Sequence, residues 1–277
     1  LVGIPFDGGS SYRTGARFGP RAIRDQSSLI RPWHPVLKVS PFERLRVADY
    51  GDLDVVPISI DRTYEVIERE IGRLVERGIV PISVGGDHSV TLPILRALAR
   101  RHGPLACVHF DAHPDTWDEY FGLPHYHGTP FRRAVEERLI DPRKMIQVGL
   151  RGPLYGEHEF DFHAAHGIEV IRIEPIKEHG VAWAADQLLR LAGAPLYCSF
   201  DIDAVDPAYA PATGTPEVGG LTSYEALALV RALQGLSFVG FDLVEVSPVY
   251  DGPGQVTSLL ASNLLFEFVC LLALARS

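Results

Sequence analysis

The chain has 277 residues, of which 46% are hydrophobic and 22% charged, a composition that excludes fibrous and disordered classes and allows a sizeable buried core. Its 26 basic and 35 acidic residues give a net charge of −9, which argues against nucleic acid as a partner because nucleic-acid binders usually carry a basic excess. An acidic chain is compatible with cationic small molecules.

Apolar, β-branched-rich runs recur along the chain and predict about eight strands. They cover residues 1–4, 46–48, 79–84, 105–110, 145–150, 169–173, 196–200 and 238–244. Segments of helical period lie between them, such as residues 64–75 before Gly78 and residues 92–98 before Gly103. The alternation predicts an α/β protein whose mostly parallel sheet has helices on both faces. No composition shift divides the chain, so we expect a single domain over residues 1–277.

The three cysteines, Cys107, Cys198 and Cys270, are flanked by apolar residues and form no CxxC pair, so we expect buried, reduced thiols. The longest apolar run, residues 259–275, is interrupted by polar residues and falls short of the ~20 residues that a membrane span needs. No membrane partner is therefore predicted. With no secretory signal in the sequence, a cytoplasmic location is the default expectation.

Polar residues follow three of the predicted strands. In parallel sheets, ligands bind beyond the carboxyl ends of the strands, so these positions are candidates for a functional site. Residues two apart in extended chain point to the same side, which groups Asp111 with His113 and Asp115, and Asp201 with Asp203. Each motif alone is more typical of a turn or a helix cap. Together with His88, however, they make four carboxylates and two imidazoles at three strand ends.

This set of six residues favours a metal centre. Carboxylates gathered in one crevice repel one another, whereas a pair of divalent cations neutralises them. A carboxylate-rich set without thiolates favours Mn²⁺ or Mg²⁺, and the two imidazoles favour Mn²⁺ over Mg²⁺. We therefore predict two Mn²⁺ ions that share bridging carboxylates and hold a bridging water, whose lowered pKa supplies hydroxide near neutral pH.

Several motifs in order along nearly the whole chain resemble the ureohydrolase family, which includes the arginases and agmatinases. They are residues 3–6, 15–20, 85–89, 110–115, 199–207 and 244–248. The resemblance implies an arginase-like, three-layer α/β/α fold and a binuclear manganese centre that hydrolyses a guanidino group to urea and an amine. It also implies a homo-oligomer, either a trimer or a hexamer.

Carried over by motif, the resemblance implies a role for each site residue. His88 would bind one manganese and His113 the other, Asp111 and Asp201 would bridge, Asp115 would complete the first site and Asp203 the second. Asp115 would also orient the metal-bridging hydroxide. His127 matches the family's proton-shuttle histidine, and Glu245 matches the glutamate that pairs with the guanidinium in a bidentate geometry.

The loop of residues 116–126 is aromatic and acidic and resembles the agmatinase branch. Agmatine, which would be cleaved to putrescine and urea, ends in a free amine, and the candidate contacts for that amine are Asp118, Glu119 and Tyr126. Thr215 is a candidate for the same pocket. Ala212 departs from the family pattern, where glycine is usual; with a positive φ it would add strain of ~1 kcal/mol or more.

Alternatives remain open at this level. Hydrolases of 4-guanidinobutyrate, 3-guanidinopropionate or arginine use the same chemistry on other substrates. A catalytically silent homologue that binds a polyamine for regulation is disfavoured by the complete ligand set. A zinc amide deacylase on a related scaffold predicts fewer carboxylate ligands and a single metal.

Overall fold

Seven parallel strands form one sheet in the computed structural model, which describes residues 1–275, and their spatial order is β1-β2-β7-β6-β3-β4-β5. The strands are β1 (Val2–Gly3), β2 (Ile82–Val84), β3 (Leu105–Phe110), β4 (Ile140–Val148), β5 (Glu169–Ile171), β6 (Leu196–Asp201) and β7 (Phe238–Val244). The last strand in the chain, β7, therefore lies between β2 and β6. The predicted α/β class with a parallel sheet is confirmed.

The predicted strand at residues 46–48 is wrong. This segment lies beside the first strand, since the Leu1 amino group donates to the Ala48 carbonyl at 2.7 Å. The Tyr50 amide then donates to the Leu1 carbonyl at 2.9 Å, and the Gly3 amide donates to the carbonyl of Gly51, whose φ of +87° lies outside the extended region. The extended geometry breaks at this glycine, so only an isolated bridge between Gly3 and Asp52 forms, and the sheet has seven strands.

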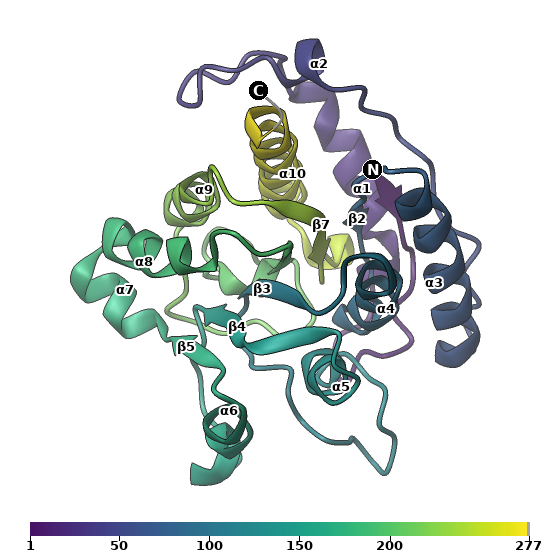
Figure 1. The fold of residues 1–277 in the computed structure, drawn as a ribbon, viewed down its shortest axis with the longest axis vertical. Helices are drawn as coiled ribbons and strands as arrows, with labels where there is room; N and C mark the ends of the chain where they lie inside the picture. Colours follow the sequence, from purple (N-terminus) through teal and green to yellow (C-terminus); the bar gives the residue numbers. More distant parts are fainter. Residues whose placement is uncertain (276–277) are drawn as a thin grey trace.

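Helices cover both faces of the sheet, which confirms the three-layer architecture. Figure 1 shows α9 and α10 on one side of the strands and α4 and α5 on the other. The helices are α1 (Gly19–Gln26), α2 (Pro41–Arg44), α3 (Ile60–Glu76), α4 (Thr91–His102), α5 (Pro130–Glu136), α6 (Asp161–His166), α7 (Ile173–His179), α8 (Val181–Leu188), α9 (Ser223–Ala232) and α10 (Val256–Ala275).

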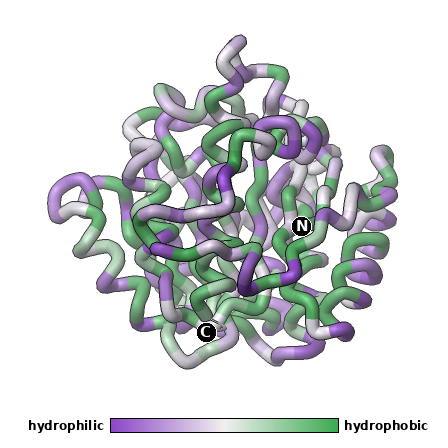
Figure 2. The backbone as a smooth tube through the Cα atoms, turned by 90° about the horizontal axis from the view of Figure 1, so that it is seen from above, coloured by the Kyte–Doolittle hydropathy of each residue, from purple (hydrophilic) through white to green (hydrophobic). Residues whose placement is uncertain are grey.

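The helices α3 and α4 form where the sequence predicts them. The Ser59 side chain accepts a hydrogen bond from the Arg62 amide and caps the start of α3. Hydrophilic and hydrophobic residues alternate along the turns of α3, the helix at the right of Figure 2. Its buried positions include Ile67 and Ile71, as expected for one apolar helix face. Glycines with positive φ follow both helices, Gly78 at +75° and Gly103 at +74°.

The alternating residues of β3 pack into the two apolar layers on opposite faces of the sheet. Ala106, Val108 and Phe110 belong to the layer under α1, α9 and α10. Leu105 and Cys107 belong to the layer under α3, α4 and α5. Burial on both faces explains why the strands are apolar throughout. The prediction for the cysteines is also confirmed, because all three are buried and free.

The C-terminal helix α10 is 20 residues long, and a window of 18 of these residues has a mean hydropathy of 2.0. By length and composition it could therefore cross a membrane. The expectation that this run is too short is therefore wrong. However, 72% of that window is buried inside the protein. Its Glu267 is buried as well, accepting from Arg231 at 2.6 Å and lying 3.0 Å from His34 Nε2. Burial on this scale, with the one buried carboxylate paired to Arg231, is typical of a core helix.

His163 of α6 is 2% exposed, and burial lowers its pKa to about 4, with a further contribution from His109. Between pH 6.5 and 4 the unfolded chain binds a proton that the folded protein does not, so stability falls as pH falls. In metal-free protein we expect wild type to lose about 2 kcal/mol more than His163→Gln between pH 7 and 5, measured by denaturant unfolding. His158→Gln, at an exposed histidine, should retain the wild-type pH dependence. Parallel losses in wild type and His163→Gln would contradict a neutral His163.

Candidate metal centre

The predicted site residues all follow four adjacent central strands, in the order β2, β7, β6 and β3. His88 follows β2, and the Asp87 carboxylate caps its turn by accepting from the Ser89 amide at 3.0 Å. Asp201 ends β6 and caps the next turn by accepting from the Asp203 amide at 2.8 Å. Because parallel strands end at the same edge of the sheet, residues distant in sequence are brought to one place.

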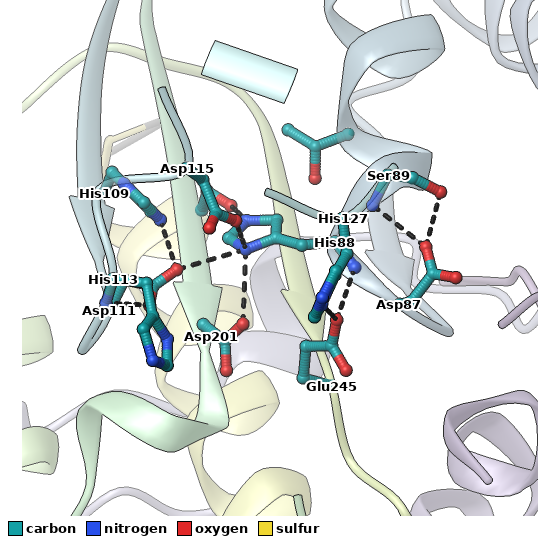
Figure 3. Close-up of polar contacts among 12 residues, drawn as sticks. Asp87, His88, Ser89, His109, Asp111, His113, Asp115, His127, Asp201 and Glu245 are labelled. Carbon is teal, nitrogen blue, oxygen red and sulfur yellow. Dashed lines mark hydrogen bonds and ion pairs between the residues drawn. The ribbon is translucent and has the colours of Figure 1, made fainter. Parts of the chain in front are cut away.

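The first cluster centres on His88, which is completely buried. Its Nδ1 atom lies 3.2 Å from Asp111 Oδ2, 3.0 Å from Asp115 Oδ2 and 3.2 Å from Asp201 Oδ2 (Figure 3). None of these contacts has hydrogen-bond geometry, and within residues 1–275 Nδ1 has no hydrogen-bond partner. Four electron-pair donors thus converge without a hydrogen bond between them.

The other ring nitrogen of His88 determines which tautomer is present. Asp242 accepts the hydroxyl hydrogen of Ser199 at 2.6 Å, so the Ser199 oxygen is left to accept from His88 Nε2 at 2.8 Å. In the neutral ring the hydrogen is then on Nε2, and the Nδ1 lone pair faces three carboxylates. Without a metal, burial alone would lower the pKa of His88, but these carboxylates raise it well above its usual range. A divalent cation among the four donors would replace the proton on Nδ1, and the donor set therefore fits such a metal.

The second cluster consists of Asp111, His113 and Asp203. His113 Nδ1 lies 3.0 Å from Asp203 Oδ2 and 3.4 Å from Asp111 Oδ1. One candidate ligand atom from each residue lies within 4.8 Å of the others, and the same holds for a group of His88, His109, Asp111 and Asp115. Asp111 belongs to both groups, whereas Asp201 lies against His88 of the first cluster.

The electrostatics of the clusters favour bound cations. Burial and the negative charges of Asp203 and Asp111 raise the pKa of Asp201 well above its usual range. Burial and the charge of Asp111 also raise the pKa of Asp203. Two divalent ions would remove this repulsion and keep the carboxylates ionised.

His127 and Glu245 lie side by side next to the clusters (Figure 3), with His127 Nδ1 3.0 Å from Glu245 Oε1. Burial alone would lower the pKa of His127, but the hydrogen bond and charge of Glu245 raise it to about 9. Glu245 Oε1 also accepts from the His88 amide at 2.9 Å. Its buried Oε2 has no hydrogen-bond partner in the described chain, so one carboxylate oxygen, and not the two expected for a bidentate contact, is unpaired.

Two of the predicted catalytic residues have backbone conformations that are unusual for non-glycine residues. Asp115 has φ +50° and Glu245 has φ +63°. Such residues cost free energy and are maintained only where the surrounding structure determines them. Ala212, by contrast, is not among the residues with positive φ, so the expected strain at this departure from the family pattern does not arise.

A cavity of about 650 Å³ opens above the clusters. Glu119, Tyr126 and Thr215 line it, as predicted. Asp118 does not; it forms an ion pair with Arg133 at 2.5 Å instead. The lining also includes Asp115, His127, Asp201, His113, Ser11, Arg151 and Glu217. Four predicted site residues thus line a pocket of small-molecule size, whereas four others, His88, Asp111, Asp203 and Glu245, are not in its lining.

Two residues of the site were missed in the sequence. His109 Nε2 donates to Asp111 Oδ2 at 2.7 Å, and Ser199 contacts His88 as described above. His109 lies in β3 two positions before Asp111, which follows the strand, and Ser199 lies in β6 two positions before Asp201. Because side chains two apart share a face of a strand, this period could have identified them.

Replacing Ser199 by alanine is expected to weaken Mn²⁺ binding by about 10-fold or more, since the hydroxyl that accepts from His88 Nε2 orients this proposed ligand. Isothermal titration of metal-free protein measures this. Ser83→Ala is the matched control, because Ser83 is a buried strand serine whose hydroxyl has no partner in the described residues. Equal affinity in Ser199→Ala and wild type would contradict the assigned tautomer of His88.

Comparison with known proteins agrees with this geometry. A model of the arginase family matches residues 1–271. A guanidinopropionase of Pseudomonas aeruginosa is 50% identical over 275 residues, covering 99% of this chain and 86% of that protein. A mitochondrial agmatinase of Gallus gallus is 45% identical, covering 98% and 80%. The structure of proclavaminate amidino hydrolase from Streptomyces clavuligerus superposes with a TM-score of 0.94 at 43% identity, covering 99% and 91%. The chain therefore belongs to the arginase family, as a guanidino hydrolase of its agmatinase branch.

Proposed function

We propose that this protein is a binuclear manganese hydrolase that cleaves the guanidino group of agmatine to putrescine and urea. The observation that carries the proposal is the buried His88 Nδ1, which faces three carboxylate oxygens at 3.0–3.2 Å without a hydrogen bond. His88, Asp111, Asp115 and Asp201 would hold one ion, and Asp111, His113, Asp201 and Asp203 the other. Carboxylate and imidazole donors without thiolates favour Mn²⁺.

Bound divalent ions lower the pKa of water and so supply a nucleophile near neutral pH. The chain's own residues supply position and protons. Glu245 is buried and is not among the residues that line the cavity, so its unpaired Oε2 would accept from a guanidinium N–H, and hold the carbon above the clusters, only where substrate binding uncovers it. His127, hydrogen-bonded to both Glu245 and Ser11, lines the cavity and would carry a proton to the leaving amine.

The charges around the cavity favour a substrate with a cationic distal end. Glu119 and Glu217 line the cavity wall. Arg151 is the one lysine or arginine in the lining formed by the described residues, and it donates to the carbonyls of Asp203, Ala204 and Glu217. Its charge is therefore directed to the backbone, and a free amine meets a more complementary surface than a carboxylate does.

A guanidino acid is the second candidate substrate. The relative named guanidinopropionase, at 50% identity, supports it, because the two chains share half of their residues over nearly the whole length. In that case the carboxylate of the substrate would have to pair with Arg151 or lie in a solvent-facing part of the cavity.

Urea release decides between these substrates. Protein stripped with EDTA should be inactive, and Mn²⁺ should restore activity on agmatine in preference to 4-guanidinobutyrate, 3-guanidinopropionate and L-arginine. A preference for a guanidino acid would agree with the proposed hydrolysis but contradict the inference of a cationic distal end from the charges around the cavity. Two bound Mn²⁺ ions with no urea from any of the four substrates would favour the silent polyamine-binding homologue instead.

A further inference from the structure

Gln147 of β4 lies outside the four strands that carry the site residues, and its side chain is completely buried. Its amide group has three partners. Nε2 lies 2.6 Å from the Pro114 carbonyl oxygen and 2.9 Å from His109 Nδ1, and Oε1 lies 2.6 Å from His163 Nε2. Gln147 therefore contacts the backbone between His113 and Asp115 as well as the histidine behind Asp111.

The direction of each hydrogen bond follows from Pro114. A carbonyl oxygen can only accept, so the Gln147 atom that faces it must be the amide nitrogen. The second N–H of that amide then points at His109 Nδ1, which must accept. A neutral His109 consequently has its hydrogen on Nε2 and donates it to Asp111 Oδ2 at 2.7 Å (Figure 3).

His163 supports the same orientation of the amide. Its Nε2 must donate to Gln147 Oε1, and its buried Nδ1 has no hydrogen-bond partner among residues 1–275. This is the pattern of a neutral imidazole with one hydrogen, in agreement with the lowered pKa of His163 described above. His163 thus donates to Gln147, Gln147 donates to His109, and His109 donates to Asp111.

We propose that Gln147 is a positioning residue for the metal centre. Through His109 it orients the Asp111 carboxylate, which belongs to both candidate clusters, and through Pro114 it holds the segment that carries His113 and Asp115. One buried amide thereby sets the geometry of three proposed ligands. The inference rests on the proposed function, because it takes these residues as metal ligands.

The first test is the tautomer of His109 in metal-free wild-type protein, read from long-range ¹H–¹⁵N NMR correlations. We expect the hydrogen on Nε2. A hydrogen on Nδ1 would overturn the inference, because Gln147 could then not be the donor. This measurement requires no substitution at position 147, so it decides even if variants there fail to fold.

The second test compares Gln147→Glu and Gln147→Leu with wild type by isothermal titration of Mn²⁺ into metal-free protein. Glutamate retains the shape but cannot donate to Pro114 or His109, and leucine removes all three bonds. Both should weaken Mn²⁺ binding about 10- to 100-fold, as loss of a residue that holds a metal ligand in place usually does. Met145→Leu is the matched control, at a buried position on the same face of β4, and should bind as wild type does.

The outcomes separate this inference from the proposed function. Wild-type affinity in a folded Gln147→Leu protein, with an unchanged melting temperature, would overturn the positioning role while leaving the metal centre intact. Failure of the wild-type protein to bind Mn²⁺ would overturn the proposed function, and this inference with it.

Discussion

Replacement of Asp115 by alanine is expected to reduce urea release by about 1,000-fold or more, the largest effect of any substitution considered. The Asp115 carboxylate lies 3.0 Å from His88 Nδ1 and lines the cavity floor, so its removal takes away a proposed ligand and the group that would orient the nucleophile. The side chain does not belong to the apolar layers of the core, so the fold should persist.

The measurement is steady-state urea release with Mn²⁺ in excess, accompanied by metal quantification and circular dichroism. Asp118→Ala is the matched control, because this aspartate is in the same loop but its side chain is 62% exposed and paired with Arg133. It should retain nearly full activity. A folded, metal-loaded Asp115→Ala protein with substantial turnover would refute the role of Asp115.

Replacement of Glu245 by glutamine is expected to lower kcat/KM by roughly 100- to 1,000-fold, the range found when one buried charged or polar contact to the reacting group is removed. Glutamine retains the shape of the side chain but loses the charge that would pair with the guanidinium. It also removes the negative charge that raises the pKa of His127, so the pKa of that imidazole should fall below about 9. The part of the pH profile of kcat/KM that reports the ionisation of His127 should therefore shift to lower pH.

Glu267→Gln controls for the loss of a buried carboxylate as such. Glu267 is 2% exposed, but its partners are Arg231 and His34, far from the cavity lining. This variant should lose stability in thermal unfolding while its kcat/KM stays near wild type. Equal kcat/KM for Glu245→Gln and wild type would remove Glu245 from the proposed guanidinium contact.

The parallel sheet and the proposed ligand set could be predicted from the sequence because both depend on short-range patterns. Apolar runs that alternate with helical segments determine the α/β class. The ligand motifs are local as well, since Asp111, His113 and Asp115 fall within five consecutive positions, although the positive φ of Asp115 departs from the extended chain that grouped them. The failure at residues 46–48 was also local in origin, because Gly51 with its positive φ ends the extended geometry that the apolar residues suggested.

Only the tertiary structure decided which distant groups meet. The placement of β7 between β2 and β6 brings Glu245 to His88, 157 positions away, and aligns Asp242 with Ser199. Gln147 reaches Pro114 and His109 from a neighbouring strand. Hydrogen-bond direction depends on such partners, and no local pattern encodes them. The sequence by itself thus determined the fold class and the candidate ligands, whereas the folded chain determined the tautomers, the free oxygen of Glu245 and the orientation of Asp118 away from the cavity.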